Sequence, residues 1–173
     1  MSADDQHLCR LFRQKRVLEK VISHSSTKVF AYITSQDHLL VFSHPDFPEA
    51  GIQVPAGTVE PGETLPAAVL REAYEETGLI GLKLVGYLGS CIYDMSSWNG
   101  HASQHRHFFH LELNGESPSL WQHQETSGGK RDPILFELFW AKLPSGVPEL
   151  IAGHGQMLSA LLARQYQEVG CDL

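Results

Sequence analysis

The chain of 173 residues carries 13 basic and 20 acidic side chains, which gives it a formal net charge of −7. This length predicts one domain with a full core, and 42% hydrophobic with 19% charged residues is typical of a soluble globular protein. The negative balance argues against an extended nucleic-acid surface or an anionic membrane partner. No run approaches the ~20 apolar residues of a membrane span, and the three cysteines are widely spaced, so we expect free thiols and a cytoplasmic protein.

We divide the chain into an N-terminal arm or edge element over residues 1–27 and a single domain over residues 28–173. The arm mixes helical and strand-like spacing and contains the densest basic cluster, between Arg10 and Lys20. We interpret this cluster as a solvated helix face. Contact with a substrate phosphate or with a partner subunit is the alternative.

Beyond the arm, strands and helices are expected to alternate with loops. β-branched and aromatic residues predict strands over 28–34, 38–43, 52–55, 82–91, 106–113 and 134–143. Turn-rich or polar composition predicts loops over 94–100 and 114–133. Residues 149–168 predict a helix whose apolar stripe packs on the core.

The stretch from Gly57 to Leu79 carries the strongest local pattern in the chain. Pro61 and Gly62 mark a turn, and Thr64 is a suitable N-cap for a helix that follows it. Gly78 stands where a left-handed residue ends a helix. The composition therefore predicts a turn followed by a helix of about three turns.

The predicted helix concentrates negative charge. At about 100° per residue, Ala67, Val69, Leu70, Ala73 and Tyr74 would face a core. Glu72, Glu75 and Glu76 would share the opposite side, where like charges destabilise a bare helix by about 0.2–0.5 kcal/mol per pair. A cation would offset this repulsion, and hard divalent ions prefer carboxylate oxygens. We therefore expect a Mg²⁺ or Mn²⁺ site for phosphoryl chemistry, bordered by Arg71.

The spacing of these residues resembles the complete signature of the Nudix hydrolases. Its fixed positions are matched by Gly57, Glu63 and the run from Arg71 to Leu79, with an alanine at position 73 where a bulkier aliphatic residue is usual. With the expected order of strands, helix, strands and helix, the resemblance implies an α/β fold, a Nudix-like α/β/α sandwich with a mixed β-sheet between helices. It also implies divalent-metal-dependent hydrolysis of a pyrophosphate bond in a nucleoside diphosphate linked to another moiety.

The resemblance also implies roles for individual residues. Glu72, Glu75 and Glu76 would hold Mg²⁺ (or Mn²⁺), and the backbone carbonyl of Gly57 could be a further ligand. Arg71 would orient a glutamate, and Glu63 would brace the loop or act through water.

Hydrolysis also needs a group that orients or deprotonates water. Glu76 is one candidate. Outside the signature we favour Glu125 over Asp132 and Glu137, because Glu125 lies in the long expected loop and could close over substrate.

Aromatic and histidine side chains are candidates for substrate contact. Trp98 and Trp121 are expected in loops, where they could stack a nucleobase, although tryptophans folded onto the core are an equal alternative. Five histidines lie between His101 and His123. We weigh three interpretations for them: ordinary polar strand positions, substrate contact with His107 the favoured residue, and a zinc site.

The alternative function is a non-catalytic nucleotide-sensing module of the same fold. The expected partner is a small-molecule nucleotide, and a homodimer is an open option. The region after the signature has Tyr93 to Met95 where ADP-ribose members carry a proline. A nucleoside triphosphate, an ADP-sugar and a dinucleotide therefore all remain open as substrates.

Overall fold

The computed structural model describes residues 26–95, 103–125 and 133–169. One seven-stranded sheet has the order β4-β5-β1-β2-β7-β6, with β3 paired to β1 outside this path. Its strands are β1 (Ser26–Ser35), β2 (His38–Ser43), β3 (Ala56–Thr58), β4 (Leu82–Asp94), β5 (Ser103–Leu113), β6 (Leu120–Glu125) and β7 (Ile134–Lys142). The helices are α2 (Leu65–Thr77) and α4 (Leu158–Val169), with short 3-10 turns η1 (Pro48–Ala50) and η2 (Ile151–Gly153).

The sheet is mixed, as predicted, and β1 is its central strand. β1 runs parallel to β5 and antiparallel to β2 and β3, while the remaining pairs are antiparallel. The register places Val29 of β1 between His107 of β5 and Gly57 of β3. The first half of β1 therefore carries β3, the strand that leads into the signature.

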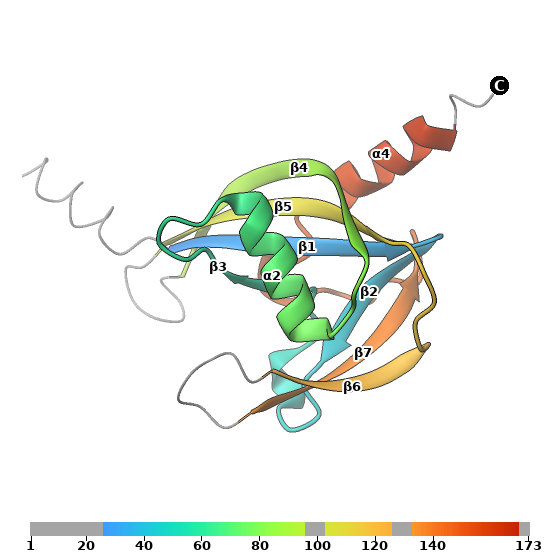
Figure 1. Ribbon diagram of the computed structural model, residues 1–173, viewed down its shortest axis with the longest axis horizontal. Coiled ribbons are helices and arrows are strands. Elements are labelled where there is room, and N and C mark those ends of the chain that lie inside the picture. The colour runs from blue at the N-terminus through green and yellow to red at the C-terminus, as the bar shows by residue number, and fades with distance from the viewer. Residues whose placement is uncertain (1–25, 96–102, 126–132, 170–173) are drawn as a thin grey trace, which may run out of the picture.

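A helix packs on each face of this sheet, which confirms the α/β/α arrangement (Figure 1). Ala68, Val69 and Ala73 of α2 belong to one buried cluster with the inward side chains of β1, β2, β5 and β7. Leu161 of α4 belongs to a second cluster with alternate residues of the same strands, such as Phe30. Successive strand residues point to opposite faces, so β1 contributes to both clusters.

The ends of α2 follow the predicted local chemistry. The Thr64 hydroxyl accepts a hydrogen bond from the backbone N–H of Ala67. Gly78 has a φ of 69° and donates its N–H to the Tyr74 carbonyl. A residue with a Cβ rarely adopts this left-handed conformation, so Gly78 suits the end of the helix.

The predicted orientation of α2 is wrong in part. Tyr74 is 56% exposed, and Ala67 is also exposed, whereas Glu72 and Glu76 are 8% and 7% exposed. The reason is that α2 packs against β3 as well as against the centre of the sheet, and this contact covers the side with the two glutamates.

The expected loop over 114–133 is also wrong, because β6 lies within it and pairs with β7. Its outward polar residues alternate with half-buried ones, so the segment reads as polar although it is a strand.

The second helix is shorter than expected and begins at Leu158, because Gly153, with a φ of 76°, and η2 occupy the earlier residues. Ile52 and Gln53 form isolated bridges, and the strand itself begins at Ala56.

The proposed arm lies outside the described residues except for its last two, which already belong to β1. The division at residues 27 and 28 stays a prediction.

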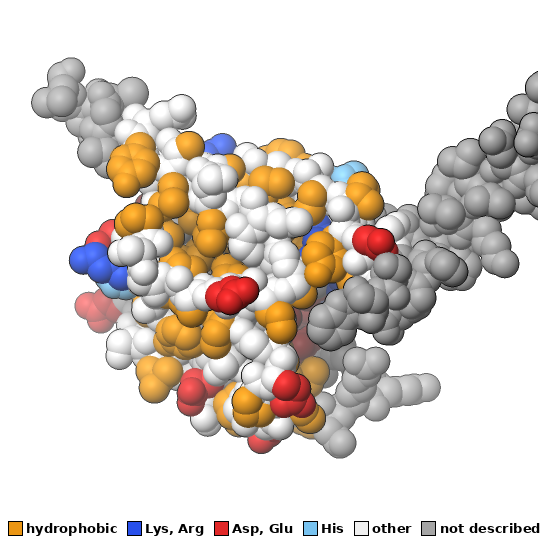
Figure 2. All heavy atoms as spheres, turned by 180° about the vertical axis from the view of Figure 1, so that it is seen from behind, with side chains coloured by type: hydrophobic (Ala, Val, Ile, Leu, Met, Phe, Trp, Pro, Cys, Tyr) orange, Lys and Arg blue, Asp and Glu red, His pale blue; other side chains and the backbone are white. Residues whose placement is uncertain are grey.

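Within the described ranges, no helix is both long enough and apolar enough to span a membrane. The face of the molecule seen in Figure 2 shows isolated Lys and Arg side chains scattered among hydrophobic and acidic ones.

Replacing Gly78 with alanine is expected to cost more stability than the same change at Gly62. Both glycines have a positive φ, so each alanine imposes a backbone cost of roughly 1–2 kcal/mol. A Cβ at Gly78 would also lie 3.0 Å from the His123 ring, whereas a Cβ at Gly62 would meet no atom within 4 Å. Urea unfolding of the two variants measures the difference, and equal losses would contradict the close contact with His123.

Candidate active site

The junction between α2 and β3 buries a carboxylate. Oε2 of Glu76 accepts a hydrogen bond of 2.8 Å from the backbone N–H of Ala56. Burial raises the pKa of Glu76 well above its ordinary value, and the charges of Glu125 and Glu72 raise it further. The Ala56 hydrogen bond and the nearby Lys28 oppose this effect. Glu76 is therefore a carboxyl group in an environment that disfavours its charge.

A second carboxylate rests on the backbone of β3. A Cβ added to Gly57 would lie 1.7 Å from the carboxyl carbon of Glu72, so a larger residue at this position would displace the Glu72 carboxylate. Burial raises the pKa of Glu72, and its hydrogen bond to Arg71 lowers it. Gly57 thus allows a close approach of the Glu72 side chain to the main chain.

Arg71 connects the turn to the helix. Its Nε and Nη2 donate to the two carboxylate oxygens of Glu63, each at 2.9 Å. Its Nη1 donates to Glu72 at 2.9 Å and to Glu75 at 3.1 Å, and Nη2 also donates to the Thr58 carbonyl at 3.1 Å. The guanidinium therefore contacts three glutamates, although the sequence suggested one.

The bidentate contact distinguishes Glu63 from the other acids. The Arg71 hydrogen bonds, helped by the backbone N–H of Glu60, lower the pKa of Glu63 to about 2. Glu63 is therefore ionised throughout the neutral range and anchors the guanidinium.

Glu125 approaches this site from β6. It is the last residue of that strand, and its charge contributes to the raised pKa of Glu76. Glu137, the alternative acid on β7, instead accepts a hydrogen bond of 3.4 Å from Gln122. Asp132 lies outside the described residues.

The three residues predicted to contact substrate are Trp98, Trp121 and His107, and the two that the structure describes lie on different strands. Trp121 is in a strand and not in a loop; its ring packs against the core, and its indole N–H donates to the Thr77 carbonyl at 3.0 Å. His107 lies on β5, with Nδ1 3.1 Å from the Tyr87 hydroxyl and its ring 4.1 Å from that of His105. Trp98 lies outside the described residues, and all three stay predictions as substrate contacts.

Sequence reasoning missed Lys28. This residue of β1 lies opposite Thr58 of β3, and its positive charge lowers the pKa of both Glu72 and Glu76. It is more than forty residues from either glutamate in sequence, and only the β1–β3 register brings it near. No local pattern could have identified it.

A divalent cation suits the donor set of this junction. Within the described part of the chain, no three His, Cys, Asp or Glu side chains are grouped closely enough to hold a metal ion as they stand. One oxygen each of Glu72 and Glu75 is taken by Arg71. The acids nevertheless present the oxygen ligands that Mg²⁺ and Mn²⁺ prefer, and their mutual repulsion favours a cation among them.

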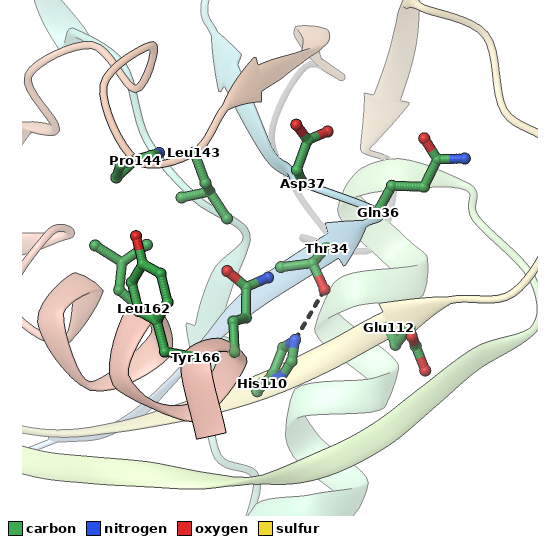
Figure 3. A pocket seen from close by; sticks show the side chains of 10 residues that line it. Thr34, Gln36, Asp37, His110, Glu112, Leu143, Pro144, Leu162 and Tyr166 are labelled. Carbon is green, nitrogen blue, oxygen red and sulfur yellow. Dashed lines mark hydrogen bonds between the residues drawn. The ribbon is translucent and has the colours of Figure 1, made fainter. Parts of the chain in front are cut away.

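A separate cavity of about 550 Å³ lies at the other end of β1 (Figure 3). Thr34, Leu143, Leu162 and Tyr166 are among its lining residues, as is His110, whose Nε2 is 2.8 Å from the Thr34 hydroxyl oxygen. Burial lowers the pKa of His110 to about 4, so this ring is neutral at pH 7. Lys28 and Thr34 mark opposite ends of the strand, so this cavity is not part of the α2–β3 junction.

Comparison with known proteins agrees with this architecture. The model of the NUDIX domain matches residues 24–156. Comparison with curated proteins gave no match. A NUDIX hydrolase from Nitrosomonas europaea is similar in structure at 22% identity, with a TM-score of 0.57 over 81% of this chain and 90% of that one. The NUDIX domain of Shewanella oneidensis NrtR complexed with ADP ribose shares 15% identity, with a TM-score of 0.58 over 82% and 88%.

A third similar structure is a bifunctional NMN adenylyltransferase/ADP ribose pyrophosphatase from Francisella tularensis, complexed with AMP and a Mn ion. It shares 18% identity with a TM-score of 0.53, and the match covers 90% of this chain but 46% of that one, so this chain spans less than half of its length. At these identities the similar structures establish the fold. The family match covers most of the chain, and the chain therefore belongs to the NUDIX domain family.

Proposed function

We propose that this protein is a divalent-metal-dependent nucleotide pyrophosphohydrolase. Its substrate is a nucleoside diphosphate linked to another moiety. The observation that carries the proposal is the pair of buried carboxylates, Glu72 and Glu76, whose pKa values are both raised at the α2–β3 junction. Buried charge of one sign is costly unless it is compensated, and a bound cation would add to the single Arg71 contact of Glu72 and the Ala56 N–H contact of Glu76.

The acidic side chains of α2 provide the ligands. Glu72, Glu75 and Glu76, with the Gly57 carbonyl, would hold Mg²⁺ or Mn²⁺. When bound, such an ion neutralises the pyrophosphate and lowers the pKa of coordinated water. The complex of the Francisella enzyme with AMP and a Mn ion supports a divalent metal, although not these particular ligands, by analogy.

The remaining residues of the site keep these ligands in place. Glu63 anchors Arg71 through two hydrogen bonds, and Arg71 in turn donates to Glu72 and Glu75. Either Glu76 or Glu125 accepts the proton of the attacking water. A carboxylate with a raised pKa is the stronger base, and burial gives Glu76 this property.

Attack of water on the phosphoanhydride gives a nucleoside monophosphate and a phosphorylated second moiety. If that moiety is a phosphate, the second product is inorganic pyrophosphate. The NrtR domain bound to ADP ribose and the Francisella enzyme bound to AMP support a nucleotide ligand by analogy. Nucleoside triphosphates, ADP-sugars and dinucleotides are therefore the panel to assay.

In such an assay, replacing Glu76 with glutamine is expected to lower kcat by about 10²–10⁴-fold, the usual effect of losing a catalytic acid or base. Turnover by the parent enzyme should require Mg²⁺ or Mn²⁺ and stop with a chelator. Product release can be followed by chromatography of the nucleotides. Glu49, an exposed glutamate of η1, supplies the matched control, and its glutamine variant should keep full activity.

Two results would contradict these assignments. A Glu76→Gln enzyme as active as the parent would remove Glu76 from the mechanism. Tight nucleotide binding by calorimetry without turnover under any metal would instead indicate the sensing module.

The same substitution should stabilise the fold at neutral and higher pH. The pKa of Glu76 is raised above 4.5 in the folded state, so its contribution to stability is greatest below pH 4.5 and is lost as the pH rises through the folded-state pKa. Glutamine keeps an oxygen for the Ala56 N–H and carries no charge. Above the folded-state pKa, we expect a gain of about 1 kcal/mol or more, which corresponds to a rise in Tm of about 2–4 °C.

Thermal melts of the parent and the Glu76→Gln protein, from below pH 4.5 to above the folded-state pKa, measure the effect. A Tm difference between the two proteins that is the same at both ends of this pH range would contradict it. Mn²⁺ should raise the Tm of the parent more than that of the variant, because a ligand stabilises the folded state that binds it.

A further inference from the structure

Alternate side chains of β6 face the end of α2. The indole N–H of Trp121 donates to the Thr77 carbonyl at 3.0 Å, and Nε2 of His123 lies 2.9 Å from the Glu75 carbonyl. A carbonyl oxygen can only accept, so Nε2 of His123 carries the hydrogen. Two side chains of one strand thus donate to two carbonyls in the last turn of the helix.

These contacts satisfy groups that a helix leaves unpaired. The last four carbonyls of an α-helix have no partner within the helix. The Gly78 N–H already bonds to Tyr74, and Trp121 and His123 supply donors to two more carbonyls of the same turn. A Cβ at Gly78 would lie 3.0 Å from the His123 ring, which shows how closely β6 packs here.

Glu125 is the next residue on this side of β6. Trp121, His123 and Glu125 are all half-buried, whereas Gln122 and Gln124 between them are exposed. Because β6 contacts α2, its alternation places the Glu125 side chain on the face of the strand that meets the helix carrying Glu76. Glu76 stands between the two residues whose carbonyls accept from β6, Glu75 and Thr77.

We propose that Trp121 and His123 are positioning residues for the reaction. Their hydrogen bonds to the last turn of α2 hold β6 in place and set where the Glu125 carboxylate stands beside Glu76. This inference rests on the proposed function, because it gives Glu125 a part in the chemistry. A misplacement of about 1 Å in a catalytic group can lower a rate by about 10²-fold, so a small shift of β6 is enough to matter.

The test compares His123→Ala, His123→Gln and Gln124→Ala. Losing the donor should lower kcat by about 10–100-fold, the usual effect of removing a group that orients a catalytic residue. KM should change little, because the His123 ring contacts the backbone of α2. Glutamine can donate to the Glu75 carbonyl and should restore most of the activity. Gln124 faces the opposite side of the same strand, and its alanine variant should match the parent.

A double-mutant cycle separates positioning from general destabilisation. If His123 acts through Glu125, the His123→Ala change should lower kcat far less in a Glu125→Gln background than in the parent. Trp121→Phe keeps a ring and loses the N–H, and it should show the same dependence on Glu125. Thermal melts check that each variant in the cycle is folded at the temperature of the assay.

The possible outcomes are distinct. Full additivity in the cycle, or a Glu125→Gln enzyme with parental kcat, would overturn this inference while leaving metal-dependent turnover intact. A parent enzyme without metal-dependent turnover would overturn the proposed function, and the inference would fall with it.

Discussion

The close approach of α2 to β3 is the constraint on which the site depends. Glu72 rests where a Cβ of Gly57 would otherwise be, and Glu76 accepts the N–H of the preceding residue, Ala56. These contacts remove both carboxylates from water at a cost to their charged forms. The helix is thus held against the strand in a way that leaves the negative charge at the junction only partly compensated, as the proposed cation site requires.

Arg71 divides the acids of the signature into two kinds. Glu63 receives two hydrogen bonds from the guanidinium and has a pKa of about 2, so it is a permanent anion that serves as an anchor. Glu72 receives one, and its pKa is raised despite it, because burial outweighs the bond. One arginine therefore stabilises the turn firmly while leaving the buried acids only partly compensated.

The far end of α2 depends on a different segment of the chain. Trp121 and His123 bond to its last carbonyls from β6, which follows the helix by more than forty residues. Lys28 contributes to the α2–β3 junction from β1, a strand that precedes the helix in sequence. The site is therefore assembled from one continuous stretch of sequence and from single side chains contributed by strands on either side.

The sequence by itself determined the local features. The N-cap at Thr64, the left-handed Gly78 and the central mixed sheet are confirmed, since each depends on neighbouring residues or on strand-like composition. The acidic cluster and the family could also be predicted from the sequence, because the residues of the signature lie in one continuous stretch. These features require no knowledge of distant contacts.

Only the tertiary structure decided which of these carboxylates are buried. A helical wheel assigns Glu72 and Glu76 to a solvent face because it assumes a single core, whereas α2 is covered by β3 as well. It also decided that β6 is a strand whose tryptophan contacts the helix, since its pairing with β7 stabilises a segment that is polar in sequence. Strand register and packing between distant segments set these positions, and no local pattern encodes either one.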